Sequence, residues 1–107
     1  MTELNTRHGY AESLQVFYRQ GITRDISWRL VKLKELKKAI LSRVESINKA
    51  LWVDLRKSEG EAYLTEIGVV IGEIDYHVKH LRRWAKGKRV PTLLPFLPSR
   101  SRIVYEP

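Results

Sequence analysis

The chain has 107 residues, 43% of them hydrophobic and 30% charged, and its 20 Lys and Arg against 12 Asp and Glu give a net charge of +8. Length and composition predict a single ordinary folded domain. The absence of cysteine excludes disulfides, thiolate-bound zinc, iron–sulfur clusters and thiol catalysis within this chain. The sequence shows neither a membrane-length apolar run nor a signal-peptide pattern, so we expect a cytoplasmic protein.

Two amphipathic helices are predicted in the first half of the chain. Four apolar residues at helical spacing predict a helix over about 9–20, ended by Gly21. A longer helix over about 25–56 follows, because its apolar residues recur every three or four positions without an interrupting glycine or proline. Asp25 has the side chain of an N-cap and is expected to begin this helix.

A third helix is predicted over about 59–86. Ser58-Glu59-Gly60-Glu61 has the form of a capping box, and apolar residues again recur at helical spacing up to Leu81. Gly68 and Gly72 lie four residues apart inside this helix, where each costs roughly 1 kcal/mol relative to alanine. Their common face predicts that another backbone approaches closely there.

The last twenty residues are not expected to form a regular helix. Pro91, Pro95 and Pro98 exclude a regular helix and predict an irregular stretch. The alternating residues after them predict a strand over about 100–105. A strand needs a pairing partner, and residues 92–97 are the candidate within the chain.

The predicted helices are long for a chain of this size. A helix over 25–56 would extend roughly 45 Å, whereas a compact domain of this length has a diameter of roughly 34 Å. Trp28, Trp52 and Tyr76 also lie away from the main apolar stripes. We therefore expect burial against another chain or against further parts of a larger protein, and we expect oligomers.

Residues 79–89 form a basic cluster with six Lys and Arg and no acid. A nucleic-acid footprint with Trp84 for stacking is one interpretation. The favoured interpretation is a solvated helix end whose cations complement the helix dipole. His77 and His80 could share a metal with Glu73, but surface histidines without a ligand are the favoured interpretation. No motif for nucleophilic catalysis or phosphate binding is present.

A series of short motifs runs through roughly residues 10–107. They are Phe17, Gly21-Ile22-Thr23-Arg24, Arg29, Leu33, Leu36, Ala50-Leu51-Trp52-Val53-Asp54-Leu55-Arg56-Lys57-Ser58, Glu61-Ala62-Tyr63, Glu66-Ile67-Gly68, Glu73-Ile74, Leu81-Arg82-Arg83-Trp84, Arg89-Val90, Pro98-Ser99 and Glu106-Pro107. In their order and spacing these motifs resemble the N-terminal portion of the aldehyde dehydrogenases, in the class 3-like branch that acts on fatty or aromatic aldehydes. One departure is Asp25, where this branch often has proline.

The resemblance implies a mainly α piece of a larger α/β enzyme. Residues 1–87 would pack on a cofactor-binding domain outside this chain, and residues 88–107 would add an irregular arm and a strand to a small oligomerisation sheet. Members of the family oxidise aldehydes to acids with NAD or NADP through a cysteine thiolate and a glutamate base. None of the family's catalytic, cofactor-binding or metal residues maps onto residues 1–107, so we expect the chain alone to be inactive and to bind no cofactor.

The resemblance predicts a scaffold segment whose partners are the remainder of the enzyme and further copies of the chain. Two alternatives to this prediction stay open. One is a freestanding basic helical module that binds nucleic acid or an acidic protein, which predicts steeply salt-dependent binding. The other is a self-associating helical protein whose exposed stripes pair between copies. The resemblance favours the enzyme segment, and we do not expect a nucleic-acid partner.

Overall fold

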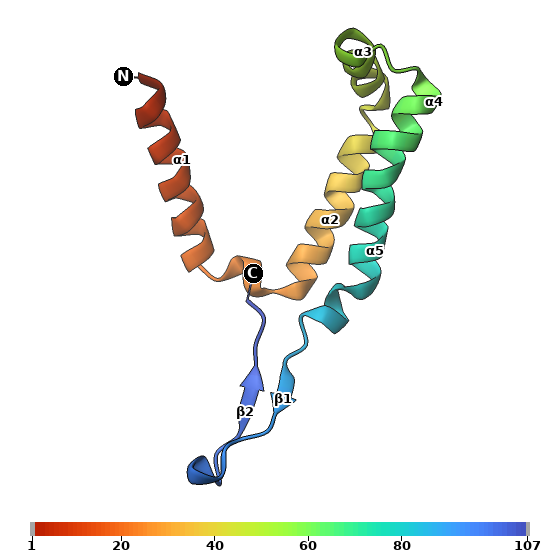
Figure 1. Cartoon of the computed structure of the whole chain (residues 1–107). Helices are drawn as coiled ribbons and strands as arrows, with labels where there is room; N and C mark the ends of the chain where they lie inside the picture. The colour runs from red at the N-terminus through yellow and green to blue at the C-terminus, as the bar shows by residue number, and fades with distance from the viewer. Residues whose placement is uncertain (1, 107) are drawn as a thin grey trace.

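The computed structural model describes the backbone of residues 2–106 and the side chains of residues 9–106. Pro107, which belongs to the Glu106-Pro107 motif, lies outside the described residues. Helix α1 (Thr2–Arg19) forms one arm, and helices α2 (Ile26–Leu41), α3 (Val44–Leu55), α4 (Glu59–Ala62) and α5 (Gly68–Trp84) form the other. A hairpin of β1 (Lys88–Val90) and β2 (Ser101–Ile103) extends away from both arms (Figure 1). The prediction of a mainly α chain with a terminal strand is confirmed.

The first arm begins earlier than predicted, at Thr2 and not near residue 9. Its end follows the prediction: α1 stops at Arg19, and Gly21 takes a left-handed conformation with φ of 76°. Glycine adopts that conformation at no steric cost. A short 3-10 turn, η1 (Ile22–Arg24), then leads to Asp25, whose carboxylate accepts hydrogen bonds from the Ser27 and Trp28 amides at 3.0 and 3.3 Å. Asp25 is the predicted N-cap, and it sets the direction in which α2 begins.

The prediction of one helix over 25–56 is wrong, because the helix breaks between α2 and α3 (Figure 1). The Ser42 hydroxyl donates to the Ala39 carbonyl at 2.9 Å, and Arg43 leaves the helical region with φ of −122° and ψ of 16°. A serine that bonds back to its own helix favours such a bend. The apolar spacing continues through the break, which is why the spacing alone did not predict it.

The third predicted helix forms as one helical stretch over residues 59–84, ending slightly before the expected position. Ser58 caps it, with its hydroxyl accepting from the Glu61 amide at 3.3 Å. Residues Tyr63–Ile67 (η2) form a π-helix between α4 and α5. Such an insertion adds one residue to a helical turn and is most often a single turn long.

The two glycines of this stretch do not share a backbone neighbour, so the predicted close approach is wrong. At Gly72 a Cβ atom would meet nothing within 4 Å. At Gly68 it would lie 2.7 Å from the carbonyl oxygen of Tyr63, which accepts the π-helical hydrogen bond from the Gly68 amide. Gly68 is therefore required by its own π-helix and not by another element.

This contrast predicts opposite effects for two alanine variants. Gly68→Ala is expected to destabilise the chain by about 1–3 kcal/mol, because the Tyr63 carbonyl must move. Gly72→Ala is expected to stabilise it by about 0.5–1 kcal/mol, because alanine has the higher helix propensity and meets no neighbour. Urea unfolding followed by circular dichroism measures both variants. Equal stabilisation by the two would contradict the role assigned to the π-helix.

A strand forms after the prolines, as predicted, but it does not pair with the predicted segment. β2 covers Ser101–Ile103, shorter than the predicted 100–105, and pairs antiparallel with β1, with Arg89 opposite Arg102. Residues 92–97 do not pair; they contain the 3-10 turn η3 (Leu94–Phe96). Pro91 and Pro95 lack the amide that a ladder needs, so this stretch forms the turn of the hairpin.

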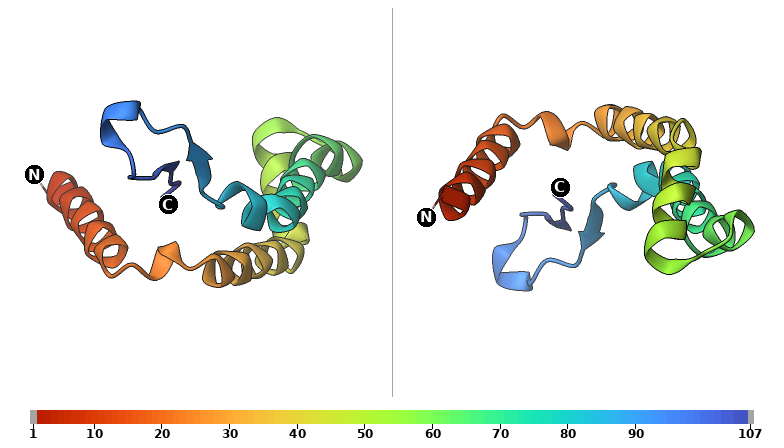
Figure 2. Two further views of the ribbon diagram at one scale, coloured as in Figure 1. Left: turned by 90° about the horizontal axis from the view of Figure 1, so that it is seen from below. Right: turned by 90° about the horizontal axis from the view of Figure 1, so that it is seen from above.

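The chain encloses a very small core. Among residues 9–106 only Ala62 of α4, Ile67 of η2 and Ile74 of α5 are buried, at 0%, 3% and 5% exposure, and α5 packs along α2. The radius of gyration is 20.4 Å, against about 13 Å for a compact domain of this length. Helix α1 stands apart from α2 and α5 in both views of Figure 2. The predicted burial against something larger is consistent with this open shape.

Candidate functional site

Two adjoining hollows form a groove where α2, the end of α5 and the residues after β2 meet. We call it the Arg29–Leu81 groove, because both hollows are lined by these two residues. The first has a volume of about 560 Å³ and is lined by Arg29, Leu81, Arg83, Trp84, Ala85, Lys86, Lys88 and Tyr105. The second, of about 340 Å³, is lined by Trp28, Arg29, Lys32, Leu33, Leu36 and Leu81.

The start of α2 positions one wall of this groove. Because Asp25 caps the helix, Trp28 and Arg29 lie in its first turn. The Arg29 Nε donates to the Thr23 carbonyl, and the rings of Trp28 and Phe17 lie 6.0 Å apart. The Lys32 ammonium stands 5.7 Å from the centre of the Trp28 ring. Rigid aromatic and guanidinium groups of this kind dominate binding energy at protein interfaces.

The end of the chain closes the other side. Arg24 of η1 forms an ion pair with Glu106 at 3.5 Å, so the segment after β2 returns to the start of α2. Figure 1 shows this return of the C-terminal segment to η1. Tyr105 thereby reaches the groove, where the charged lining residues are all basic. An apolar partner surface that carries carboxylates fits this groove best.

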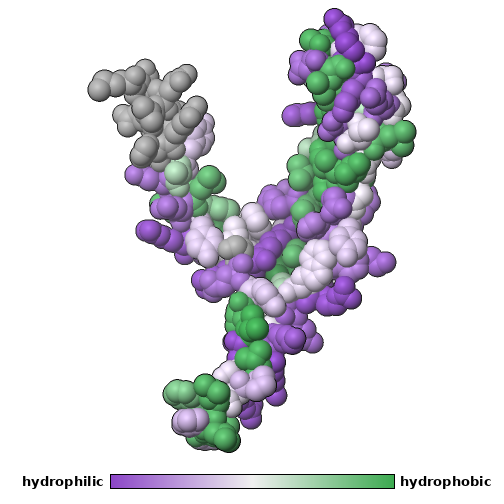
Figure 3. Space-filling model, viewed as in Figure 1, coloured by the Kyte–Doolittle hydropathy of each residue, from purple (hydrophilic) through white to green (hydrophobic). Residues whose placement is uncertain are grey.

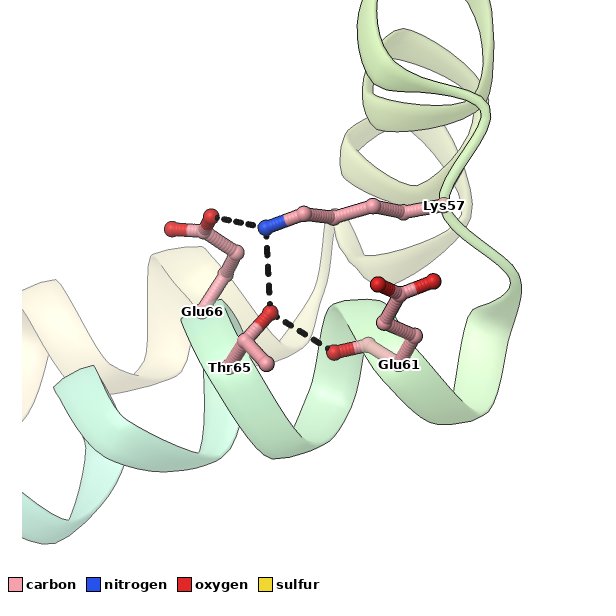
Figure 4. A network of polar contacts seen from close by, with 4 residues as sticks. All are labelled: Lys57, Glu61, Thr65 and Glu66. Atoms are coloured by element: carbon pink, nitrogen blue, oxygen red, sulfur yellow. Dashed lines mark hydrogen bonds and ion pairs between the residues drawn. The ribbon is translucent and has the colours of Figure 1, made fainter.

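A polar network fixes the turn between α3 and α4. Arg56 ends α3 with a positive φ of 56°, and Lys57 then reaches across to η2 (Figure 4). The Lys57 Nζ lies 2.6 Å from a Glu66 carboxylate oxygen and 3.1 Å from the Thr65 hydroxyl. Thr65 in turn donates to the Glu61 carbonyl at 2.8 Å. This network joins α3 to the π-helix and has a structural role.

The two histidines of α5 are placed among aromatic rings. The Nδ1 atoms of His77 and His80 lie 2.8 and 2.7 Å from the carbonyl oxygens of Glu73 and Tyr76. The His80 ring stacks on Trp84 at 5.6 Å with an interplanar angle of 20°. Among the described residues no cluster of three metal-ligating side chains occurs, so Glu73, His77 and His80 are not brought together as a metal site.

The basic residues of 79–89 are divided between two surfaces, with Arg83, Lys86 and Lys88 at the Arg29–Leu81 groove and Arg89 at another hollow. Lys79, Arg82 and Arg83 belong to α5, whereas Arg89 belongs to β1. Arg89 instead lines a hollow of about 290 Å³ with Arg100, Ser101 and Arg102. Arg100 and Arg102 were not predicted as candidate residues, although their alternation in the predicted strand places them on one face.

The comparisons with known proteins agree with the resemblance. No family model matches the chain. A 4,4'-diaponeurosporen-aldehyde dehydrogenase of Staphylococcus aureus is 43% identical over 87% of this chain, and a family 3 aldehyde dehydrogenase of Dictyostelium discoideum is 35% identical over 91% of it. A solved structure of Staphylococcus aureus AldH in a substrate-bound state superposes with a TM-score of 0.80 over 86% of this chain at 43% identity. The chain belongs to the aldehyde dehydrogenase family.

This aldehyde dehydrogenase chain spans about a fifth of the length of the curated relatives it matches, 20% of the Staphylococcus aureus protein and 21% of the Dictyostelium protein. Among its described residues no helix is long and apolar enough to cross a membrane. That the chain holds none of the family's catalytic, cofactor or metal residues stays a prediction.

Proposed function

We propose that the chain is the N-terminal helical segment of an NAD(P)-dependent aldehyde dehydrogenase and serves that enzyme as scaffold. The observation that carries this proposal is the conjunction of family membership with three buried side chains. Twenty-five large hydrophobic side chains of residues 9–106 are at least 37% exposed. A surface of this kind marks contact with other protein.

In this proposal the two parts of the chain have different partners. Residues 1–87 pack on the cofactor-binding domain through the Arg29–Leu81 groove, to whose lining Lys88 and Tyr105 of the second part also contribute. Residues 88–107 contribute β1 and β2 to a sheet used in subunit association, since a two-stranded sheet has free edges. The parent enzyme is then a homo-oligomer that oxidises aldehydes to carboxylic acids with NAD or NADP.

The chemistry of the proposed parent lies outside this chain. The thiolate that attacks the aldehyde in this family cannot come from these residues, because they include no cysteine. The groups of this chain act by holding the fold that positions the reacting parts. They include the basic rim of the groove, which is suited to orient an acidic surface.

The isolated chain is therefore expected to form no NADH or NADPH from any aldehyde. Purified chain is mixed with NAD or NADP and a series of aliphatic and aromatic aldehydes, and the absorbance of reduced nicotinamide is followed. A full-length aldehyde dehydrogenase in the same assay is the positive control. Reproducible production of reduced cofactor by clean chain would overturn the scaffold proposal.

A further inference from the structure

The helical stretch over residues 59–84 holds one residue more than a regular α-helix would. In its π-helix η2 the Gly68 amide donates to the carbonyl of Tyr63, five residues before it. The buried residues Ala62 and Ile67 are also five apart. In a regular α-helix, residues five apart point roughly 140° away from each other. A π turn holds more residues than an α turn, so it brings Ile67 back toward the face of Ala62.

The same residues have a second helical arrangement without the π turn. If residues 59–84 were α-helical throughout, the part before η2 would be rotated relative to α5 by roughly 100°, the angle of one residue. Helix α5 would keep its place, because it packs along α2 and is joined to it by the ion pair of Lys37 with Asp75 at 2.6 Å. The part that rotates is residues 44–62, which hold α3, α4 and the turn between them. We call this part the α3–α4 corner.

Helix α3 lies between two backbone breaks, where the chain can turn. Arg43 leaves the helical region before α3, and Arg56 takes a positive φ of 56° after it. A positive φ is unfavourable for a residue other than glycine, so the second break is strained. None of the α3 residues is buried, and Figure 3 shows hydrophilic side chains over much of this end of the arm. Apolar packing within this chain therefore does little to fix α3.

Polar contacts of Lys57 join the corner to the π-helix instead. Its Nζ lies 2.6 Å from a Glu66 carboxylate oxygen and 3.1 Å from the Thr65 hydroxyl (Figure 4). We call these two contacts the Lys57 clamp. The Lys57 side chain is only 20% exposed, so salt screens this ion pair less than it screens a surface pair. In the arrangement without the π turn, Thr65 and Glu66 would be rotated away from Lys57 and the clamp would be broken.

We propose that residues 59–84 have two registers, and that the Lys57 clamp stabilises the register with the π-helix. When the clamp is broken, the π turn relaxes to an α-helix and the α3–α4 corner rotates about α5 by roughly 100°. Packed helices switch between discrete arrangements of this kind because their contacts do not deform continuously. The proposal concerns contacts within this chain, so it does not depend on the proposed scaffold function.

Gly68 provides a second way to change the register. A Cβ atom at this position would lie 2.7 Å from the Tyr63 carbonyl oxygen, to which the Gly68 amide donates in the π-helix. In an α-helix the same amide donates to the carbonyl four residues before it, that of Leu64, and alanine is then the more favourable residue. Gly68→Ala is therefore expected to favour the α-helical register without any change at Lys57.

The test measures the distance between two spin labels on either side of the break at Arg43. The chain has no cysteine, so Asp54→Cys on α3 and Lys34→Cys on α2 label two exposed positions alone. Electron–electron double resonance then compares the 107-residue chain with its variants. Lys57→Met and Gly68→Ala are each expected to shift the mean distance in the same direction by at least about 5 Å, since α3 is carried around the axis of α5.

Two controls separate the clamp from the loss of a charge. Lys37→Met removes the ion pair with Asp75, which has the same length but joins α2 to α5, and it is expected to leave the label distance unchanged. Lys57→Glu with Glu66→Lys reverses the ion pair of the clamp and is expected to restore the unaltered distance. A shift in the Lys37 control equal to that in Lys57→Met would contradict the proposal.

Deletion of Leu64, a residue of η2 that is 75% exposed, removes the extra residue itself. A regular α-helix then places Ala62 and Ile67 four apart on one face. The deleted chain is therefore expected to keep the unaltered label distance both with Lys57 and with Lys57→Met. If Lys57→Met shifts the distance equally with and without the deletion, Lys57 acts independently of the π-helix and the proposal is wrong.

Circular dichroism of each variant provides the last readout. Both registers are helical, so Lys57→Met and Gly68→Ala are expected to keep the helical signal while the label distance shifts. Loss of the helical signal in Lys57→Met would show that the clamp supports folding and not a choice of register. An unaltered distance in both variants would likewise overturn the proposal.

Discussion

Ile74→Asp is expected to abolish the cooperative unfolding of the α2–α5 helix pair. Ile74 is one of the three buried residues, and it lies on α5, which packs along α2. Removing a buried isoleucine side chain costs roughly 2–5 kcal/mol, and an unpaired buried carboxylate adds to that cost. Since whole domains are stable by only about 5–15 kcal/mol, a core this small cannot absorb the loss.

Circular dichroism during heating measures this effect as loss of the helical signal and of a sharp transition. Val69→Asp is the matched control, because Val69 lies on the same helix but is 53% exposed. The control is expected to unfold within about 1 kcal/mol of the unaltered chain, as surface substitutions usually do. Similar destabilisation by both variants would show that the helix pair does not contain the core described above.

The second large effect concerns the Arg29–Leu81 groove. We consider a graft in which the chain replaces the matching segment of the Staphylococcus aureus enzyme, to which it is 43% identical. Leu81→Asp with Trp84→Ser in this graft is expected to lower aldehyde oxidation at least about tenfold, because buried aromatic anchors contribute most to an interface. In the isolated chain the same pair should alter helicity little, since Trp84 is 38% exposed there.

The control for the groove is Lys38→Asp, which places the same charge on an exposed polar position of α2. It is expected to leave the activity of the graft unchanged. A groove variant that is as active as the unaltered graft would show that another surface of the chain contacts the rest of the enzyme. A groove variant that unfolds in isolation would show instead that Leu81 and Trp84 support the segment itself.

Local interactions made part of this fold predictable from the sequence. Asp25 and Ser58 cap their helices with their own side chains, and Gly21 takes the left-handed conformation after α1. Each of these features depends on groups a few residues apart, so the residue types were sufficient to locate them.

Other features depend on interactions that residue spacing does not encode. The break after α2 comes from the Ser42 hydroxyl and the Ala39 carbonyl, while the apolar repeat continues unchanged. Strand β1 is only Lys88–Val90, too short to show alternation, so its pairing with β2 was not predicted. The predicted helix over 25–56 was too long for a compact domain; that helix breaks after α2, and the chain is nevertheless extended, with a radius of gyration of 20.4 Å.

The candidate site was the least predictable part. The Arg29–Leu81 groove joins the first turn of α2, the end of α5 and Tyr105, which are far apart in sequence. Arg24 and Glu106 form an exposed ion pair where these ends meet, and no sequence motif predicts it. Resemblance indicated that the chain packs on a larger body, but only the structure shows which surface is hollow and basic.

The central claim is that this chain is a scaffold segment of an aldehyde dehydrogenase, and the graft with the unaltered chain tests it most directly. The measurement is the rate of reduced cofactor formation by the graft, compared with the Staphylococcus aureus enzyme and with the same remainder lacking the segment. The account predicts activity in the graft and none in the truncated remainder. A soluble, folded graft without activity, or a truncated remainder as active as the graft, would contradict it.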